Sequence, residues 1–190
     1  MKLFKIVKDN QKSLRIRSTD VSFPLDENTK ETLFNMLEYL KLSQDDEFAS
    51  KNNIRSGVGL AAPQIGINKN MLAMYYYDEK NVLKQYILIN PKIVSESVKQ
   101  AYIPYGEGCL SVDKEHNGYV YRPYKVKVQA YDLLKEKNVE YVFTGFGSMC
   151  VQHEIDHLKG ILFYDHIDNS FLNFIDLDNC FKSVIGNVSK

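Results

Sequence analysis

Residues 148–160 read SMCVQHEIDHLKG, and this stretch decides how the rest of the fold must be arranged. It has none of the alternation of a strand and no glycine or proline before Gly160, which predicts a helix over residues 148–159. Glycine is common just beyond the last helical residue, so Gly160 is expected to end this helix. The helix therefore interrupts a chain whose preceding patterns are those of strands.

Strand patterns occupy the residues before this helix. Apolar and polar side chains alternate over residues 124–131 and, after a polar turn, over residues 139–143, which predicts an antiparallel hairpin. Residues 71–77 and 86–90 are apolar runs typical of strands. Pro91 is expected to limit the pairing of the second run, because proline has no backbone N–H to donate.

A second helix is predicted near the start of the chain, over residues 26–42, with Asp26 or Asn28 as its cap. Its apolar residues recur at helical spacing: Leu33, Met36, Leu37 and Leu40. Residues 57–66, GVGLAAPQIG, show no period and are expected to form a loop, and residues 168–190 carry at most a short helix. Strands grouped between an early amphipathic helix and a late helix indicate an α+β fold, in which antiparallel sheets pack around the late helix.

The composition is that of a globular chain with balanced charge. Its 190 residues suit a single domain over 1–190, and 44% hydrophobic residues are enough for a buried core. The 24 basic and 24 acidic residues give no electrostatic reason to expect a nucleic acid or a membrane as a ligand. No stretch is apolar enough for a signal peptide or a membrane span, and three cysteines are few for a disulfide scaffold. We therefore expect a cytoplasmic protein with reduced thiols.

The late helix carries the pattern H-E-x-x-H as His153, Glu154 and His157. Residues four apart stand nearly above one another, about 6 Å apart along a helix, so both imidazoles can reach one metal ion. Neutral imidazole is a good ligand for zinc and for iron. The carboxylate of Glu154 projects beside both rings, where it can take a proton from a water on the metal. The late helix is therefore expected to bind a metal ion.

Two imidazoles need a further ligand to complete a catalytic site. The longer pattern H-E-x-x-H-x-x-G-x-x-H fails, because its third histidine would fall at Phe163. No glutamate follows Glu154, which leaves four later acidic residues formally possible: Asp165, Asp168, Asp176 and Asp178. Cys150 lies about 10 Å along the helix from His157, too far for both to bind one ion. Cys109, in the segment EGCLS, is the favoured third ligand.

One thiolate and two imidazoles leave a coordination position open for water, as in catalytic rather than structural sites. The ion would convert that water to a hydroxide nucleophile near neutral pH, with Glu154 accepting the proton and passing it to a departing amine. A developing oxyanion needs hydrogen-bond donors. The side-chain amide of Gln64 and the backbone N–H of Leu110 are candidates, although by spacing alone Gln64 is simply a loop glutamine.

Three segments together resemble one family, the peptide deformylases: GVGLAAPQ at 57–64, EGCLS at 107–111 and QHEIDH at 152–157. The resemblance covers nearly the whole chain and fades after about Asp168. It implies removal of the N-formyl group from formyl-methionine at the start of nascent peptides, with release of formate. The extra stretch at 43–56, and EGCLSV in place of EGCLSI, are similar to the longer bacterial subgroup called type 2.

The resemblance also assigns roles to individual residues. It makes Cys109, His153 and His157 the ligands of one Fe2+, which Zn2+, Ni2+ or Co2+ can replace, and Glu154 the catalytic acid and base. It makes Gln64 and Leu110 the donors to the oxyanion. Residues at the positions of the family's methionine pocket are Val58, Gly59, Tyr105, Glu107, Phe146, Met149 and Cys150. Nascent peptides are the implied partner, and the ribosome near its exit tunnel is a candidate partner.

Other classes of function and other roles for single residues stay open at this point. A general metallopeptidase would cleave unformylated peptides, and a metal-stabilised binding protein would hydrolyse no peptide. Glu107 and Arg122 fit either a supporting ion pair or a pair at the surface, and Asp156 fits either a partner of a ligand or a solvated residue. His116 and His166 have no partner pattern and are expected in surface or turn positions.

Overall fold

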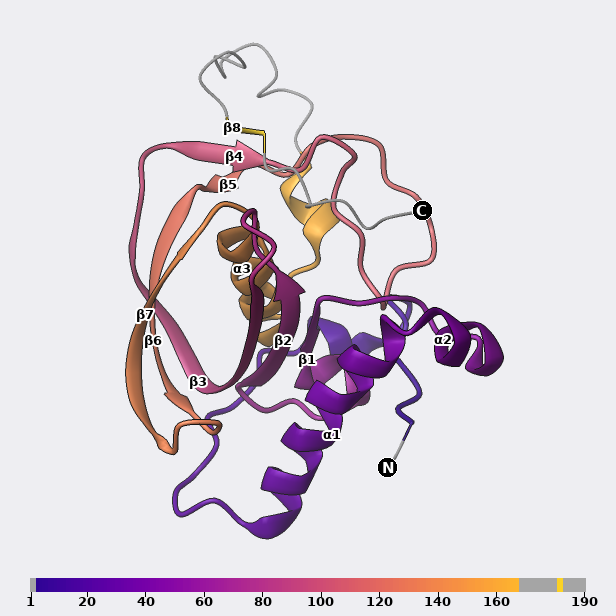
Figure 1. Cartoon of the computed structure of the whole chain (residues 1–190), viewed down its shortest axis with the longest axis vertical. Helices are drawn as coiled ribbons and strands as arrows, with labels where there is room; N and C mark the ends of the chain where they lie inside the picture. The colour runs from indigo at the N-terminus through magenta and orange to yellow at the C-terminus, as the bar shows by residue number, and fades with distance from the viewer. Residues whose placement is uncertain (1–2, 168–180, 183–190) are drawn as a thin grey trace.

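The computed structural model of the chain describes residues 3–167 and 181–182. Within this part, five antiparallel strands form the main sheet in the order β1-β2-β3-β6-β7 (Figure 1). They are β1 (Gly59–Ala61), β2 (Met71–Tyr77), β3 (Leu83–Glu96), β6 (Lys125–Asp132) and β7 (Lys137–Thr144). A smaller sheet joins β4 (Gln100–Tyr102) to β5 (Arg122–Pro123) and, in parallel, to β8 (Phe181–Lys182). The fold is thus α+β, as the sequence predicts.

The described helices are α1 (Glu27–Ser43), α2 (Asp46–Asn52) and α3 (Gly145–Lys159), with 3-10 turns η1 (Lys12–Arg15), η2 (Ala62–Ile65) and η3 (Phe163–His166). Helices α1 and α3 cover opposite faces of the main sheet, whereas α2 packs against α1. Alternate residues of β2 separate the two layers, because side chains of a strand point to opposite faces. Met71 and Ala73 pack in the same cluster as α1, whereas Leu72 and Met74 pack in the cluster of α3.

Helix α1 confirms the prediction of an amphipathic helix at the front of the chain. The carboxylate of Asp26 accepts a hydrogen bond of 2.8 Å from the backbone N–H of Thr29 and so caps the first turn. The four apolar residues at helical spacing are all buried: Leu33, Met36, Leu37 and Leu40. Their burial against β1 to β3 anchors the helix on the sheet.

Helix α2 is an addition to the predicted elements. Asp45 caps it by accepting a hydrogen bond of 2.8 Å from the N–H of Phe48, and Asn53 ends it in left-handed backbone. The sequence of α2 has no apolar stripe, and none of its residues is fully buried. Its sequence signals are therefore confined to its two ends, where Asp45 caps the first turn and Asn53 follows the last.

Two predictions for the strands require correction. The segment 57–66 is not only a loop: Leu60 pairs with Ala73 in the short strand β1, and η2 follows. Pro91 does not end the strand at residue 90, because β3 continues to Glu96. Asn90 has a positive φ of 51° and the register shifts between Ile89 and Lys92, so the proline sits at an irregularity where its missing N–H is tolerated.

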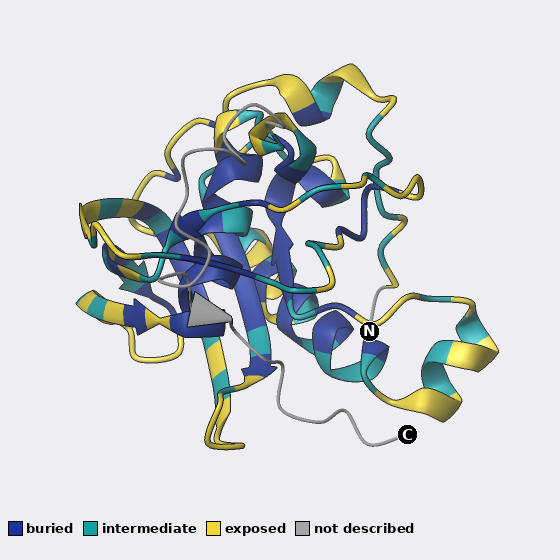
Figure 2. Ribbon diagram, turned by 90° about the horizontal axis from the view of Figure 1, so that it is seen from above, coloured by how far each residue is buried: buried dark blue, intermediate teal, exposed yellow. Residues whose placement is uncertain are grey.

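The hairpin and the late helix agree with the predictions. Strands β6 and β7 pair antiparallel, with Val126 opposite Phe143, and alternate residues of β6 face α3. Helix α3 starts three residues earlier than predicted, at Gly145, and ends at Gly160, which has a φ of 76°. Thirteen of its 15 residues are buried, and Figure 2 shows this interior in dark blue. The main sheet therefore encloses a helix that carries several polar side chains.

No helix within residues 3–167 or 181–182 is both long and apolar enough to cross a bilayer. The short helix that the sequence allows over residues 168–190 lies outside the described residues, apart from the paired β8.

Replacing Gly160 by alanine is expected to lower the free energy of unfolding by about 1–3 kcal/mol, because L-residues rarely adopt this left-handed backbone. A Cβ at Gly160 would also lie 2.6 Å from the backbone oxygen of Arg15. Chemical denaturation measures the loss. The neighbouring Lys159→Ala, at an exposed position of the same helix end, should change stability by less than about 0.5 kcal/mol, and an equal loss in both variants would contradict this account.

Candidate metal centre

Three side chains from two distant segments of the chain lie close together. His153 and His157 project from the same face of α3, with ring centroids 5.0 Å apart. Cys109 comes from the loop between β4 and β5, and its Sγ lies 3.2 Å from Nε2 of His157. One ligand atom from each residue lies within 4.8 Å of the other two. This separation suits three ligands of a single metal ion.

Cys109 is buried, and two hydrogen-bond donors point at its sulfur. The side chain is buried in a small cluster with Val112, Val120 and Phe163. Its sulfur accepts hydrogen bonds of 3.4 Å from the N–H of Ser111 and 3.5 Å from Nε2 of Gln64. Metal ions bind cysteine in its thiolate form. The donor set of one sulfur and two imidazoles therefore fits a soft divalent cation such as iron or zinc.

The orientation of Gln64 is set by its own hydrogen bonds. Its Oε1 accepts the backbone N–H of Ala61 at 2.8 Å, which directs the amide nitrogen to Cys109 and to Oγ of Ser111. Gln64 is buried at the end of η2, and Leu110 follows Cys109 directly. Both residues line the cavity beside the cluster.

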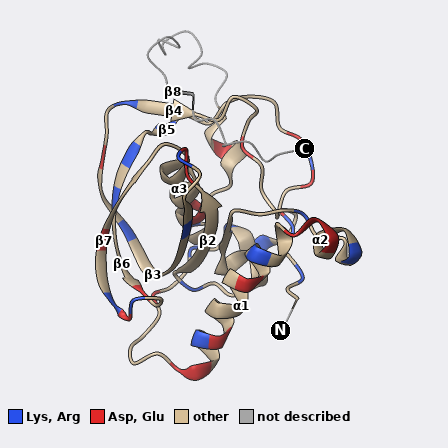
Figure 3. Cartoon of the chain, in the orientation of Figure 1, with Lys and Arg blue, Asp and Glu red and all other residues tan. Residues whose placement is uncertain are grey.

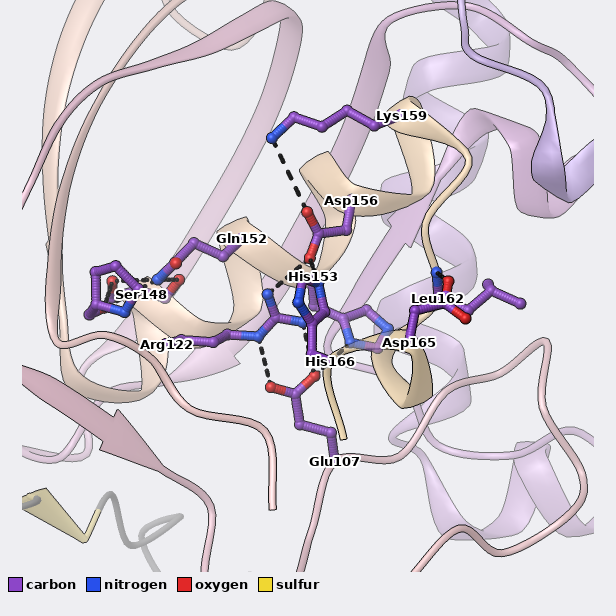
Figure 4. A network of polar contacts seen from close by, with 11 residues as sticks. Glu107, Arg122, Ser148, Gln152, His153, Asp156, Lys159, Leu162, Asp165 and His166 are labelled. Carbon is purple, nitrogen blue, oxygen red and sulfur yellow. Dashed lines mark hydrogen bonds and ion pairs between the residues drawn. The ribbon is translucent and has the colours of Figure 1, made fainter. Parts of the chain in front are cut away.

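The ring of His153 is held from behind by a buried ionic group (Figure 4). Its Nδ1 lies 2.9 Å from Oε2 of Glu107, so an N–H at Nδ1 fixes the ring and leaves Nε2 for a metal. Arg122 donates two hydrogen bonds to Glu107, at 2.6 and 3.0 Å. Both charged side chains are 4% exposed, so this ion pair is not a surface pair. Burial raises the pKa of Glu107, but Arg122 and His153 outweigh it and hold the pKa at about 2.

The two imidazoles differ in their electrostatics. Burial, together with the neighbouring His153, lowers the pKa of His157 well below its ordinary value, which favours the neutral ring that metals require. Burial also works to lower the pKa of His153, but hydrogen bonds to Cys109 and Glu107 raise it well above the usual value. A proton and a metal cation compete for the same lone pair of His153.

Glu154 lies beside the two histidines with its side chain in the cavity. It is 4% exposed, and its Oε2 has no hydrogen-bond partner within the described residues. Burial raises the pKa of this carboxyl to about 7, partly opposed by His153 and Arg122. A pKa near neutrality suits a group that accepts and returns a proton. A Cβ at Gly59 would lie 2.2 Å from Oε1 of Glu154, so glycine is what lets the carboxylate lie against β1.

A cavity of about 210 Å³ opens beside the cluster. Six of the seven residues predicted for the methionine pocket line it: Val58, Gly59, Glu107, Phe146, Met149 and Cys150. Tyr105 does not, and its place in the pocket is corrected. It lies in a turn closed by a hydrogen bond from the N–H of Gly106 to the oxygen of Ile103, and is 96% exposed. Ile103 also lines the cavity, although the resemblance of the three segments to the family did not indicate this residue.

Of the four acidic residues left open as ligands, the structure describes one, Asp165. Asp165 pairs with Arg15 and accepts the N–H of Leu162, and Asp168, Asp176 and Asp178 fall outside the described residues. Cys150 packs with Phe146 on α3, its sulfur 3.8 Å from the oxygen of Val58. Cys180 is also outside the described residues.

Three polar residues acquire partners that sequence spacing does not show. Asp156 is buried and accepts a hydrogen bond of 2.7 Å from Arg122, so it is not a solvated residue. His166 bonds to the same carboxylate at 2.8 Å, and His116 stacks on Tyr164. Elsewhere, charges of both signs are interspersed over elements that include α1, α2, β6 and β7 (Figure 3). Only the fold brings together residues 107, 122, 156 and 166.

Comparison with known proteins gives one consistent result. The sequence profile described as polypeptide deformylase matches residues 3–171. A peptide deformylase of Listeria monocytogenes serotype 4b (strain CLIP80459) is 46% identical over 173 residues, which cover 91% of this chain and 94% of the relative. One from Staphylococcus epidermidis (strain ATCC 35984) is 49% identical over 164 residues, covering 86% and 89%. The crystal structure of an Acinetobacter baumannii class I type b peptide deformylase with bound Met-Ala-Ser superposes with a TM-score of 0.69 at 31% identity, covering 87% and 99%.

The fold and the site thus define a metal-dependent hydrolase with its H-E-x-x-H motif on a helix enclosed by the sheet. The chain belongs to the peptide deformylase family. Enzymes of this family remove the N-formyl group from nascent peptides and depend on a bound metal, and formylated nascent peptides are the substrate of this chain.

Replacing Cys109 by serine is expected to weaken metal binding by about 10-fold or more, because a neutral hydroxyl is a poorer ligand than a thiolate. Metal per chain after dialysis, together with competition against a chelator, measures this loss. Cys150→Ser makes the same chemical change at another buried thiol lining the cavity and should bind metal as the parent does. Equal metal affinity in the parent and both variants would exclude Cys109 as a ligand.

Proposed function

We propose that Cys109, His153 and His157 hold one Fe2+, and that Glu154 moves the proton in the removal of formyl groups from formyl-methionyl peptides. The observation that supports this most is the meeting of the three ligand atoms within 4.8 Å of one another, next to a buried carboxylate. Zn2+, Ni2+ or Co2+ are expected to replace the iron, because the same sulfur and imidazole ligands accept all of these ions. When bound, the ion supplies Lewis-acid chemistry that acidifies water and polarises a carbonyl oxygen.

The proton transfers fall to Glu154. A water molecule adds to the formyl carbon while the carboxylate accepts one of its protons. The same carboxyl then gives this proton to the amine nitrogen as the carbon–nitrogen bond breaks, so the products are formate and a free N-terminus. The pKa of about 7 lets the group hold the proton between these two steps near neutral pH.

Two donors beside Cys109 are proposed to stabilise the oxyanion that forms when water adds. The hydrogen bond from the N–H of Ala61 to Oε1 of Gln64 limits the rotation of this amide and keeps its nitrogen beside Cys109. The backbone N–H of Leu110 follows the metal-binding sulfur directly in the chain. Both residues line the cavity next to Glu154.

The cavity is proposed to receive the methionine side chain. Its wall is largely apolar, from Val58, Phe146, Met149 and Cys150, which suits an unbranched thioether. Gly59 at the edge strand β1 allows an extended peptide backbone to approach. Glu107 is assigned to the support of His153 rather than to substrate contact, because Arg122 and His153 engage its carboxylate.

The setting of the reaction is also part of the proposal. A cytoplasmic enzyme with reduced thiols suits a site whose ligand is a free cysteine. Contact with the ribosome near its exit tunnel would bring the enzyme to nascent chains. Helix α2 in the segment 43–56 is consistent with the type 2 subgroup.

The purified chain, loaded anaerobically with Fe2+, is expected to release formate from a formyl-Met dipeptide. Glu154→Gln should lower kcat by about 100-fold or more, because an amide cannot accept the proton of water. Formate release at saturating substrate measures kcat, and metal analysis of the same samples shows that the variant still holds its ion. Parent protein with a full complement of iron and no formate release would overturn the proposal. Cleavage of unformylated peptides, detected by amine release, would favour a general metallopeptidase.

Gly59→Ala is expected to lower kcat/KM by about 100-fold. The new Cβ would lie 2.2 Å from Oε1 of Glu154 and would therefore displace this carboxylate. Gly108→Ala is the matched control in the same cavity wall, since a Cβ at Gly108 meets no atom within 4 Å. Formate release by both variants measures the difference. Comparable activity of the two variants would contradict this placement of Glu154.

A further inference from the structure

His166 lies outside the three sequence motifs and yet is joined to the metal centre through a series of side-chain hydrogen bonds (Figure 4). It is the last residue of η3, and its Nε2 lies 2.8 Å from Oδ2 of Asp156 on α3. The side chain is 37% exposed, whereas that of Asp156 is 10% exposed. His166 therefore reaches from the surface to a buried carboxylate one residue before the ligand His157.

From Asp156 the contacts continue to the other histidine ligand. Oδ2 of Asp156 also accepts Nη1 of Arg122 at 2.7 Å, so one oxygen receives both donors. Arg122 donates hydrogen bonds to Glu107 from Nε and Nη2, at 2.6 and 3.0 Å. Oε2 of Glu107 then lies 2.9 Å from Nδ1 of His153. Each side chain in this series restricts the rotation of the next.

The charges of this group explain why a further donor matters. Glu107 and Asp156 are two buried carboxylates that share one guanidinium, from Arg122. A buried carboxylate is stable only when a nearby positive charge or hydrogen-bond donors replace the water that it has lost. Nζ of Lys159 lies as far as 4.0 Å from Oδ1 of Asp156, and its side chain is 46% exposed. It therefore stabilises the charge of Asp156 only weakly. Burial raises the pKa of Asp156, but the bond from His166 and the charge of Arg122 bring the pKa to about 2.

The element that carries His166 is itself anchored. The carboxylate of Asp165 accepts the N–H of Leu162 at 2.9 Å at the start of η3. The same carboxylate pairs with Arg15 in η1, and Phe163 packs against the ring of His153 at a centroid distance of 6.1 Å. These contacts fix the backbone from which His166 projects. The imidazole therefore approaches Asp156 from a defined position rather than from a free surface loop.

We propose that His166 is a positioning residue, whose Nε2–H holds Asp156 and, through Arg122 and Glu107, the orientation in which His153 meets the metal ion. The inference rests on the proposed function, since it takes His153 as a ligand. A histidine with its proton on Nε2 donates this hydrogen bond whether or not the ring is charged. What His166 supplies is therefore a directed donor to a carboxylate that also accepts Arg122.

The test uses three variants of the full chain: His166→Ala, His166→Gln and Lys159→Ala. Each is loaded with Co2+, whose visible absorption reports the geometry of its ligands, and the rate of Co2+ loss to a chelator is measured. The kcat and KM for a formyl-Met-Ala peptide are determined with the same samples. Removal of a direct partner of a ligand costs about 10–100-fold, so removal of this more distant donor should cost about 3–10-fold.

His166→Ala is expected to lower kcat by this factor with KM unchanged within about twofold, to speed loss of Co2+ similarly, and to alter its spectrum. His166→Gln should restore all three quantities, because its amide keeps an N–H for Asp156. Lys159→Ala removes the ammonium group that lies 4.0 Å from Oδ1 of Asp156 and should match the parent. Parental values for His166→Ala would overturn the inference, as would a loss that His166→Gln repeats in full. If the parent binds Co2+ without deformylating peptide, the proposed function fails, while metal loss and spectrum still decide the role of His166.

Discussion

The convergence of a loop thiol and two helix imidazoles is the constraint on which the rest of the molecule depends. Sγ of Cys109 and Nε2 of His157 lie 3.2 Å apart although 48 residues separate them. Helix α3 must therefore be buried deeply enough for the loop after β4 to cross it, and 13 of its 15 residues are buried. A helix this enclosed loses the solvent that would hydrate its polar side chains. The surrounding elements supply replacements from the protein itself.

These replacements compensate the buried charges and also orient a histidine of the metal centre. Arg122, from β5, lies between the carboxylates of Glu107 and Asp156, so the buried charges compensate one another. Glu107 then holds the ring of His153. The pKa of Glu154 rises to about 7, because burial outweighs the opposing charges of His153 and Arg122. The two carboxyls thus differ in pKa because Arg122 donates hydrogen bonds directly to Glu107, whereas burial dominates at Glu154.

Local patterns predicted elements wherever burial is regular along the chain. The stripe of Leu33, Met36, Leu37 and Leu40 marked α1, and the alternation over residues 124–131 marked β6, because each face meets the core along its whole length. The same reasoning failed where tertiary contacts decide. Helix α2 has no buried face, and β1 is three residues long and exists through its pairing with β2. Strand β3 passes Pro91 because the register shifts there, which no local preference indicates.

For the site, the sequence by itself determined which side chains can bind a metal and move a proton. The spacing of His153 and His157 on a helix follows from 3.6 residues per turn, and Glu154 must then stand beside them. Only the tertiary structure decided that Cys109 meets these rings, that Tyr105 points away from the cavity, and that Asp156 joins Arg122 to His166. A helical repeat relates residues that are close together in the chain, so it can be recognised in the sequence. Contacts between distant segments depend on how the sheet and the helix pack.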